Sequence, residues 1–141
     1  VIEDLFRTLK SEGVNYEASE LESGKGLRKL FVLAFMTAIQ ILQLRQARDG
    51  QTEQKTSLVF SEEQAECLKD LLLKFEGKTE KQKNPWPPRN LAWASWVIGR
   101  LGGWKGYKSQ RPPGVITLYE GLTRFHDIFQ GWLLAKDVYK R

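Results

Sequence analysis

The sequence predicts an all-α protein of about five helices, and three observations lead to this fold class. Every long apolar segment has the three- and four-residue spacing of a helix. No segment shows the sustained two-residue alternation of a half-buried strand. The chain has 141 residues, of which 41% are hydrophobic and 11% aromatic, and this is enough for one real core. We therefore expect helices joined by polar segments, without a substantial sheet.

The first ten residues predict a helix with two unlike faces. Its apolar residues share one arc and are Ile2, Leu5, Phe6 and Leu9. On a helix, Glu3, Arg7 and Lys10 fall within roughly 60° of one another on a separate face. A carboxylate flanked by two cations is an arrangement that could serve an active site. A Glu with a cation four residues later is, however, also a common surface pair, worth a few tenths of a kcal/mol. From the residues alone, the surface pair is the favoured interpretation and the chemical role is the alternative.

Residues 27–48 predict a second helix that is apolar almost all round, as a helix buried on most sides is. Its longest apolar run, residues 30–39, is too short to span a bilayer, so we expect a buried helix. The polar residues 49–57 include Gly50 and are the best candidate for a joint between two parts of the chain.

A third helix is expected to follow Ser61, which can cap the helix start while Gln64 reciprocates, and to run to about Phe75. Residues 76–88 are rich in Lys, Gly and Pro, which predicts an exposed linker. Asn90 can cap a fourth helix that ends at Gly102. Small residues on a narrow arc of this fourth helix would let another helix approach closely, and they are Ala92, Ser95 and Gly99.

The final helix, expected over residues 115–139, has apolar residues on two sides. The core stripe consists of Leu118, Leu122, Phe125, Phe129, Trp132 and Leu133. A second apolar strip on a terminal helix is typical of a partner surface, although a small domain could simply bury it. If this helix pairs two protomers, we expect the contact residues to be those away from the core stripe, namely Ile116, Tyr119, Leu134 and Val138.

Charge and reactive residues exclude some classes of protein. The chain has 22 Lys and Arg against 17 Asp and Glu, which gives a net charge of +5. This charge favours binding to a polyanion, but many soluble domains are as basic. A single Cys67 excludes an internal disulfide and favours a reducing compartment. With His126 as the only histidine, no cluster of thiolate and imidazole metal ligands can form.

Residues 104–111 interleave Lys105, Lys108 and Arg111 with Trp104 and Tyr107. This pattern could bind nucleic acid by phosphate pairing and base stacking. The alternative, which we favour, is a turn whose aromatic rings pack while its lysines are solvated.

Several separated segments together resemble a known family. Glu3 is followed after six residues by Lys10, with Arg7 between them. Residues 42–45 read LQLR, residues 91–104 read LAWASWVIGRLGGW, and RPPG and LAKD follow at 111–114 and 134–137. These segments resemble the C-terminal part of bacterial cut-and-paste transposases of the insertion-sequence-four family, the type carried by transposon five. The resemblance covers nearly the whole chain.

The resemblance implies a transposase whose Asp, Asp and Glu carboxylates hold two divalent metal ions, Mg²⁺ or Mn²⁺. Glu3 would be the third metal-binding carboxylate, and Arg7 and Lys10 would hold phosphates of the transposon end. Residues 1–50 would then be the C-terminal end of an RNase H-like catalytic domain, and residues 51–141 a helical dimerisation domain. Both aspartates of the metal site, and the Tyr and Arg of the family signature, would lie before Val1.

The implied partners are transposon-end DNA and a second protomer in the DNA complex, with neither a membrane nor a small-molecule substrate. The parent protein would be cytoplasmic and associated with the bacterial nucleoid. Because the chain lacks an initiating Met and begins inside a helical pattern, we expect a fragment that holds no metal and has no activity alone. Two alternatives remain open: a non-enzymatic helical protein-interaction module, and a stand-alone DNA-binding domain that uses residues 105–111.

Overall fold

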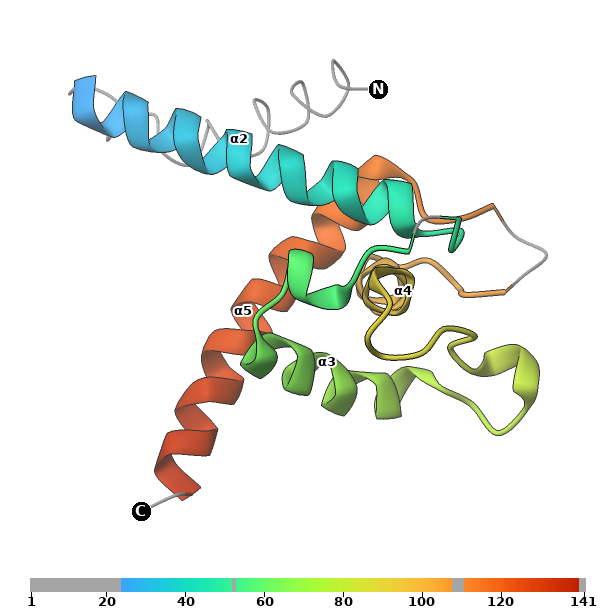
Figure 1. Ribbon diagram of the computed structural model, residues 1–141. Helices are drawn as coiled ribbons and strands as arrows, with labels where there is room; N and C mark the ends of the chain where they lie inside the picture. Colours follow the sequence, from blue (N-terminus) through green and yellow to red (C-terminus); the bar gives the residue numbers. More distant parts are fainter. Residues whose placement is uncertain (1–23, 52, 108–110, 140–141) are drawn as a thin grey trace.

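The computed structural model describes residues 24–51, 53–107 and 111–139, and this part of the chain is all-α, as the sequence predicts. Its α-helices are α2 (Gly24–Ala47), α3 (Glu62–Phe75), α4 (Leu91–Leu101) and α5 (Val115–Tyr139), as Figure 1 shows. Two short 3-10 helices, η1 (Thr56–Leu58) and η2 (Glu80–Gln82), lie in the connections. Within the described ranges the β pairing is a single isolated bridge between Lys55 and Asn90. The helix expected over the first ten residues lies outside these ranges.

Helix α4 is the centre of the core. Every residue of α4 except Arg100 is buried, and the helix contacts α2, α3, α5 and η1. In Figure 1 it is seen almost end-on, below α2 and above α3. Asn90 caps it as predicted, because its Oδ1 accepts a hydrogen bond from the backbone N–H of Ala92 at 2.9 Å. The helix ends at Gly102, also as predicted.

Small residues allow the other long helices to approach α4. Ser95 donates a hydrogen bond to the backbone carbonyl of Leu44 on α2, at 2.9 Å, so the predicted arc of small residues meets a helix at Ser95. Gly99, on the same arc, lies against the side chains of Pro113 and Trp104, which belong to no helix. On α5, Gly121 lies directly against the carbonyl of Ile98, and an added Cβ would overlap that oxygen. The close approach of α5 to α4 therefore depends on a glycine at residue 121.

Helix α2 has two unlike halves. Its C-terminal half contributes Ile41, Leu44 and Ala47 to the same core as α4 and α5. In its N-terminal half the exposed large apolar side chains are Phe31, Val32, Leu33, Phe35, Met36 and Ile39. The expectation of a helix buried on most sides is wrong for this half, because the described helices cover only the other end.

One stretch of α2, Arg28–Ala47, is long and apolar enough by length and composition to cross a membrane. The apolar run at residues 30–39 was expected to be too short to span a bilayer. The helix that contains this run is longer and still apolar enough, so that expectation is corrected. One such helix is weak evidence for a membrane span, because core helices of soluble proteins meet the same criterion.

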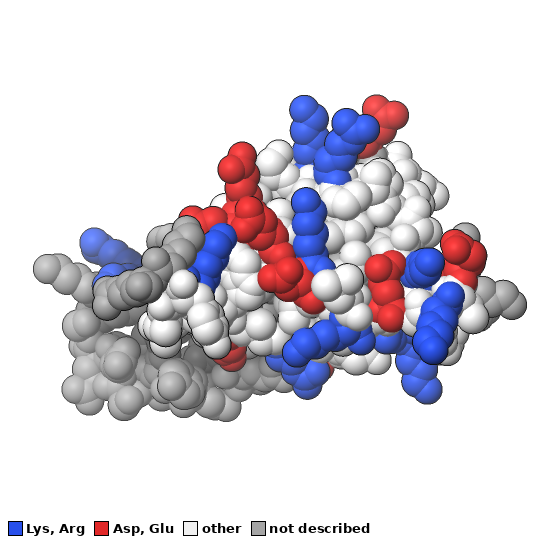
Figure 2. Space-filling model, turned by 90° about the horizontal axis from the view of Figure 1, so that it is seen from below, with Lys and Arg blue, Asp and Glu red and all other residues white. Residues whose placement is uncertain are grey.

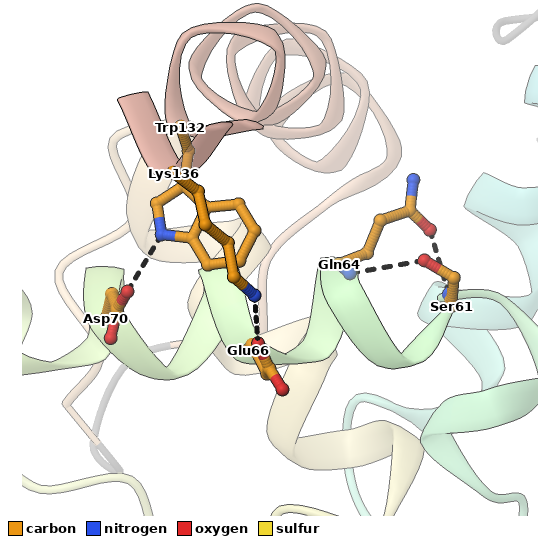
Figure 3. Close-up of polar contacts among 6 residues, drawn as sticks. All are labelled: Ser61, Gln64, Glu66, Asp70, Trp132 and Lys136. Carbon is orange, nitrogen blue, oxygen red and sulfur yellow. Dashed lines mark hydrogen bonds and ion pairs between the residues drawn. The ribbon is translucent and has the colours of Figure 1, made fainter. Parts of the chain in front are cut away.

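Helix α3 begins at the capping box that the sequence predicts. Ser61 Oγ accepts a hydrogen bond from the backbone N–H of Gln64 at 3.2 Å, and Gln64 Oε1 accepts one from the backbone N–H of Ser61 at 2.9 Å (Figure 3). Cys67 and Leu68 fill its buried side. Burial raises the pKa of the Cys67 thiol to about 11, with Asp70 acting in the same direction, so the thiol stays protonated and unreactive at neutral pH.

Residues 76–88, which follow α3, were expected to form an exposed linker, but hydrogen bonds fix part of this segment to the helices beside it. The backbone N–H of Asn84 donates to the Glu76 carboxylate at 2.8 Å, and the Asn84 side-chain amide donates to the carbonyl of Trp93 at 3.0 Å. These hydrogen bonds hold the segment against the end of α3 and the side of α4.

The end of α2 is tied to the start of α5. Arg48 Nη1 donates a hydrogen bond to the carbonyl of Pro113 at 2.7 Å. Burial lowers the pKa of Arg48, and the nearby Arg45 acts in the same direction. The division expected near residue 50 stays a prediction about domains, while the structure packs the C-terminal half of α2 into one core with α4 and α5.

Candidate functional site

The residues expected to do chemistry, Glu3, Arg7 and Lys10, lie outside the described residues, and their roles stay predictions. Within residues 24–51, 53–107 and 111–139, no group of three or more His, Cys, Asp or Glu side chains is arranged to hold a metal ion. The features that the structure does place are the two faces of α5, the turn after α4, and a hollow around Arg100.

Helix α5 carries its core stripe and an exposed strip on opposite sides. Ile116, Leu134 and Val138 are 52%, 67% and 63% exposed. At 100° per residue these three point within about 40° of one another. Ile116 and Leu134 are about 27 Å apart along the helix axis. Tyr119, the fourth expected contact residue, is half-buried and packs against the core, so the structure does not bring it together with the other three.

A row of aromatic rings joins α5 to the core. The ring of Phe125 meets Phe60 edge-on, with centroids 5.6 Å apart. Phe129 stacks on Phe125 at 5.8 Å, and Trp132 stacks on Phe129 at 5.9 Å. The core stripe predicted for this helix therefore continues as stacked rings towards its C-terminal half.

Polar contacts then hold the far end of α5 to α3, as Figure 3 shows. Trp132 Nε1 donates a hydrogen bond to the Asp70 carboxylate at 2.8 Å, and Lys136 Nζ donates to the Glu66 carboxylate at 2.9 Å. The Lys136 ammonium also lies 4.8 Å from the centre of the Trp132 ring. The hydrogen bond to Glu66 raises the pKa of Lys136. We call these four residues the α3–α5 clamp, and it joins α3 to the half of α5 that carries Leu134 and Val138.

Replacing Trp132 with Phe should lower the free energy of unfolding by about 1 kcal/mol, because the stacked ring stays while one hydrogen bond is lost. Asp70→Asn is the matched control, because its amide oxygen can still accept that bond, and it should cost less. Urea unfolding gives both values, and hydrogen exchange of residues 133–139 should become faster in Trp132→Phe. Equal stability of Trp132→Phe and the unchanged protein would mean that the hydrogen bond between Trp132 and Asp70 contributes nothing to the stability of the fold.

The turn after α4 fits the favoured, structural interpretation only in part, because Trp104 packs but the ring of Tyr107 is exposed. The ring of Trp104 packs edge-on against Trp96 with centroids 6.2 Å apart, and its Nε1 donates to the carbonyl of Arg111 at 2.9 Å. Lys105 and Tyr107 are exposed. Residues 108–110 lie outside the described ranges, so the nucleic-acid interpretation of the whole segment stays open.

Sequence reasoning passed over Arg100, which has an unusual environment. Its Nη1 and Nη2 donate to the carbonyls of Trp104 and Phe75 at 3.1 and 3.5 Å. Its guanidinium carbon lies 5.4 Å from the ring centre of Phe75 and 5.8 Å from that of Trp96. Its Nε is buried without a hydrogen-bond partner. The signal was present in the sequence, because a lone cation in an otherwise apolar helix has to be accommodated at a cost.

Surface charge is mixed rather than uniformly basic on the face seen in Figure 2. Acidic and basic side chains alternate across this face. Helix α3 contributes exposed residues of both signs, including Glu66, Lys69, Asp70 and Lys74. The described residues on this face therefore form no broad basic surface that could cover a duplex.

Comparison with known proteins adds no family assignment. No family model and no curated protein matches the chain. The residues themselves, together with the geometry of α2 and α5, are the grounds for a functional conclusion.

Proposed function

We propose that this chain is the C-terminal part of a cut-and-paste DNA transposase. In this proposal it supplies the third metal-binding carboxylate, basic residues that contact phosphates, and the surface that pairs two protomers on transposon ends. The parent protein would be the enzyme, and this chain alone would have no activity, because one carboxylate cannot position two metal ions. The segments at 3–10, 42–45, 91–104, 111–114 and 134–137 support the assignment through their resemblance to the family.

The observation that carries the proposal is the uncovered apolar half of α2. Its side chains include Phe31, which is 70% exposed, and Phe35, which is 58% exposed. Burying a large apolar side chain is worth about 1.5–3 kcal/mol, so a contiguous exposed set of this kind indicates a missing contact surface. A helix at the end of an RNase H-like catalytic domain would bury this half against the rest of that domain. The other half of α2 already lies in the C-terminal core, as a helix that joins two units would.

The metal chemistry would centre on Glu3. A carboxylate oxygen is a hard ligand that suits Mg²⁺ or Mn²⁺, and the ions would activate the attacking oxygen and stabilise the leaving one during phosphodiester cleavage. Arg7 and Lys10, one and two turns along the same helical face, would hold phosphates of the transposon end beside Glu3. These cations would also offset the repulsion between Glu3 and the DNA backbone.

Helix α5 would supply the pairing surface through Ile116, Leu134 and Val138. The strip is narrow, and small interfaces are weak without help, which here would come from the shared DNA. The α3–α5 clamp would keep Leu134 and Val138 in one orientation before pairing, which reduces the entropy lost on association. The isolated chain should therefore be a monomer or a weak dimer at micromolar concentration.

Leu134→Glu combined with Val138→Glu in the full-length parent should abolish the paired-end complex and leave thermal stability nearly unchanged. Both side chains are more than 60% exposed, so the charges cost the fold little. A native gel shift with transposon-end DNA measures pairing. Leu73→Glu is the matched control, because Leu73 is 76% exposed on α3, outside the strip. A double variant that still assembles paired ends would show that protomers meet through another surface.

A helical protein-interaction module is the second candidate, because an uncovered apolar helix face also suits a protein partner. The reading frame upstream of Val1 separates the two candidates. The transposase requires two aspartates in strand contexts there, together with a Tyr and an Arg just before Val1. Their absence would favour the interaction module.

A further inference from the structure

We propose that the hollow around Arg100 binds a phosphate group of a nucleic-acid strand. The hollow has a volume of about 330 Å³ and lies where the end of α3, the end of α4 and the following turn meet. The residues that matter among its lining are Lys74, Phe75, Trp96, Arg100, Lys105 and Tyr107. The site itself rests on this geometry, and only the identification of the strand as DNA rests on the proposed function.

Positive charge is in excess in the hollow. Lys74, Arg100 and Lys105 line it, against one carboxylate, that of Glu76. That carboxylate already accepts a hydrogen bond from the backbone N–H of Asn84 at 2.8 Å. None of the three cations forms an ion pair with an acidic residue in the described part of the chain. An anion from outside would therefore find uncompensated charge.

The contacts of Arg100 orient its guanidinium before any ligand binds, and they leave some of its N–H donors without a partner. A guanidinium has five N–H donors, and the bonds to the carbonyls of Phe75 and Trp104 use two of them. The rings of Phe75 and Trp96 hold its plane without neutralising its charge. Its Nε is buried and has no partner, and native proteins seldom leave such a group unsatisfied. A phosphate presents several strong acceptors that match this planar fork.

The turn after α4 shapes the hollow. Gly106 has a φ of 79°, a left-handed backbone conformation that favours glycine. A Cβ at this position would lie 3.0 Å from the Arg100 side chain and 3.2 Å from the Trp96 ring. Glycine thus keeps the turn close to both. Tyr107 is 42% exposed beside this turn and offers a ring on which a base next to the bound phosphate can stack.

Lys74→Gln combined with Lys105→Gln is the first test, because both side chains are exposed and the fold should not depend on them. Fluorescence anisotropy with a labelled thymidine oligonucleotide measures binding. The variant should bind about tenfold more weakly, and its salt slope should flatten by about 0.7 for the one phosphate lost. Lys55→Gln with Lys69→Gln removes the same charge from exposed lysines outside the hollow. Equal losses in the two double variants would overturn the proposal.

The second test follows the Nε–H of Arg100 in a proton–nitrogen correlation spectrum. The oligonucleotide should move the signal of Arg100 and leave those of Arg48 and Arg124, which donate to the carbonyls of Pro113 and Leu101, in place. An unmoved Arg100 signal would contradict the site. A shift with inorganic phosphate but no binding of the oligonucleotide would mean that the site takes a free anion and not a strand. Pairing through α5 tests the proposed function separately, because its variants leave this hollow intact.

Discussion

Replacing Gly121 with Ala should lower the free energy of unfolding by about 2–3 kcal/mol, although alanine is the better helix former. The added Cβ would overlap the carbonyl oxygen of Ile98 and lie 3.0 Å from the backbone nitrogen of Gly102. Both neighbours are backbone atoms, one in the buried α4 and one in the residue that follows it, so neither can rotate away as a side chain would. Helix α5 would have to move off α4, and the contacts around the buried Phe125 would loosen with it.

The same helix provides a matched control for this prediction. Gly131 on α5 has nothing within 4 Å of the position that a Cβ would take. Gly131→Ala should therefore raise the free energy of unfolding by about 0.5–1 kcal/mol through helix propensity alone. Urea unfolding followed by circular dichroism compares the two variants. If Gly121→Ala is as stable as Gly131→Ala, then α5 does not approach α4 as closely as described.

Glu3→Gln in the full-length parent should reduce strand cleavage by orders of magnitude and leave binding to transposon ends intact. Glutamine keeps the shape of the side chain but removes the charge that would hold the metal ion. Cleavage is measured with labelled transposon-end DNA and Mg²⁺ or Mn²⁺, and binding with the same DNA in a gel shift. Loss of binding in place of cleavage would mean that Glu3 has a structural role.

Asp4→Asn is the matched control for Glu3→Gln. Asp4 is the neighbouring carboxylate, and on a helix it points about 100° away from Glu3. It should keep nearly full cleavage activity. If both variants lose activity equally, the effect of Glu3→Gln is one of local charge and not of a metal ligand.

Helix ends were predictable from the sequence because each depends on residues within one turn. Ser61 and Gln64 form the expected capping box, and Asn90 caps α4. The residues of the α5 core stripe were also predictable, since 3.6-residue spacing places them on one face regardless of what covers them. Leu118, Leu122 and Phe125 are indeed buried.

Exposure was predicted less well where it depends on neighbouring elements. Three of the four residues expected on the outer face of α5 are exposed, but Tyr119 packs against the core. Periodicity gives the direction of a side chain and not the reach of the adjacent helices, so it cannot separate Tyr119 from Ile116. For the same reason, the N-terminal half of α2 has the sequence pattern of a core helix, but none of the described helices covers its apolar side chains.

The two candidate sites also differ in whether the sequence alone could reveal them. The carboxylate and cations of Glu3, Arg7 and Lys10 could be proposed from the sequence, since i, i+4 and i+7 spacing puts them on one face of a single helix. The hollow around Arg100 could not, because its residues come from α3, α4 and the turn after α4.

By itself, the sequence determined the all-α class, the bounds of most helices and the stripe by which α5 packs, because these follow from local propensity and periodicity. Only the tertiary structure decided which surfaces meet. The clamp pairs residues 62 and 70 positions apart in the chain, and Gly121 matters through the Ile98 carbonyl of another helix. Contacts of this kind depend on how helices cross, and nothing in the local pattern of either partner specifies the other.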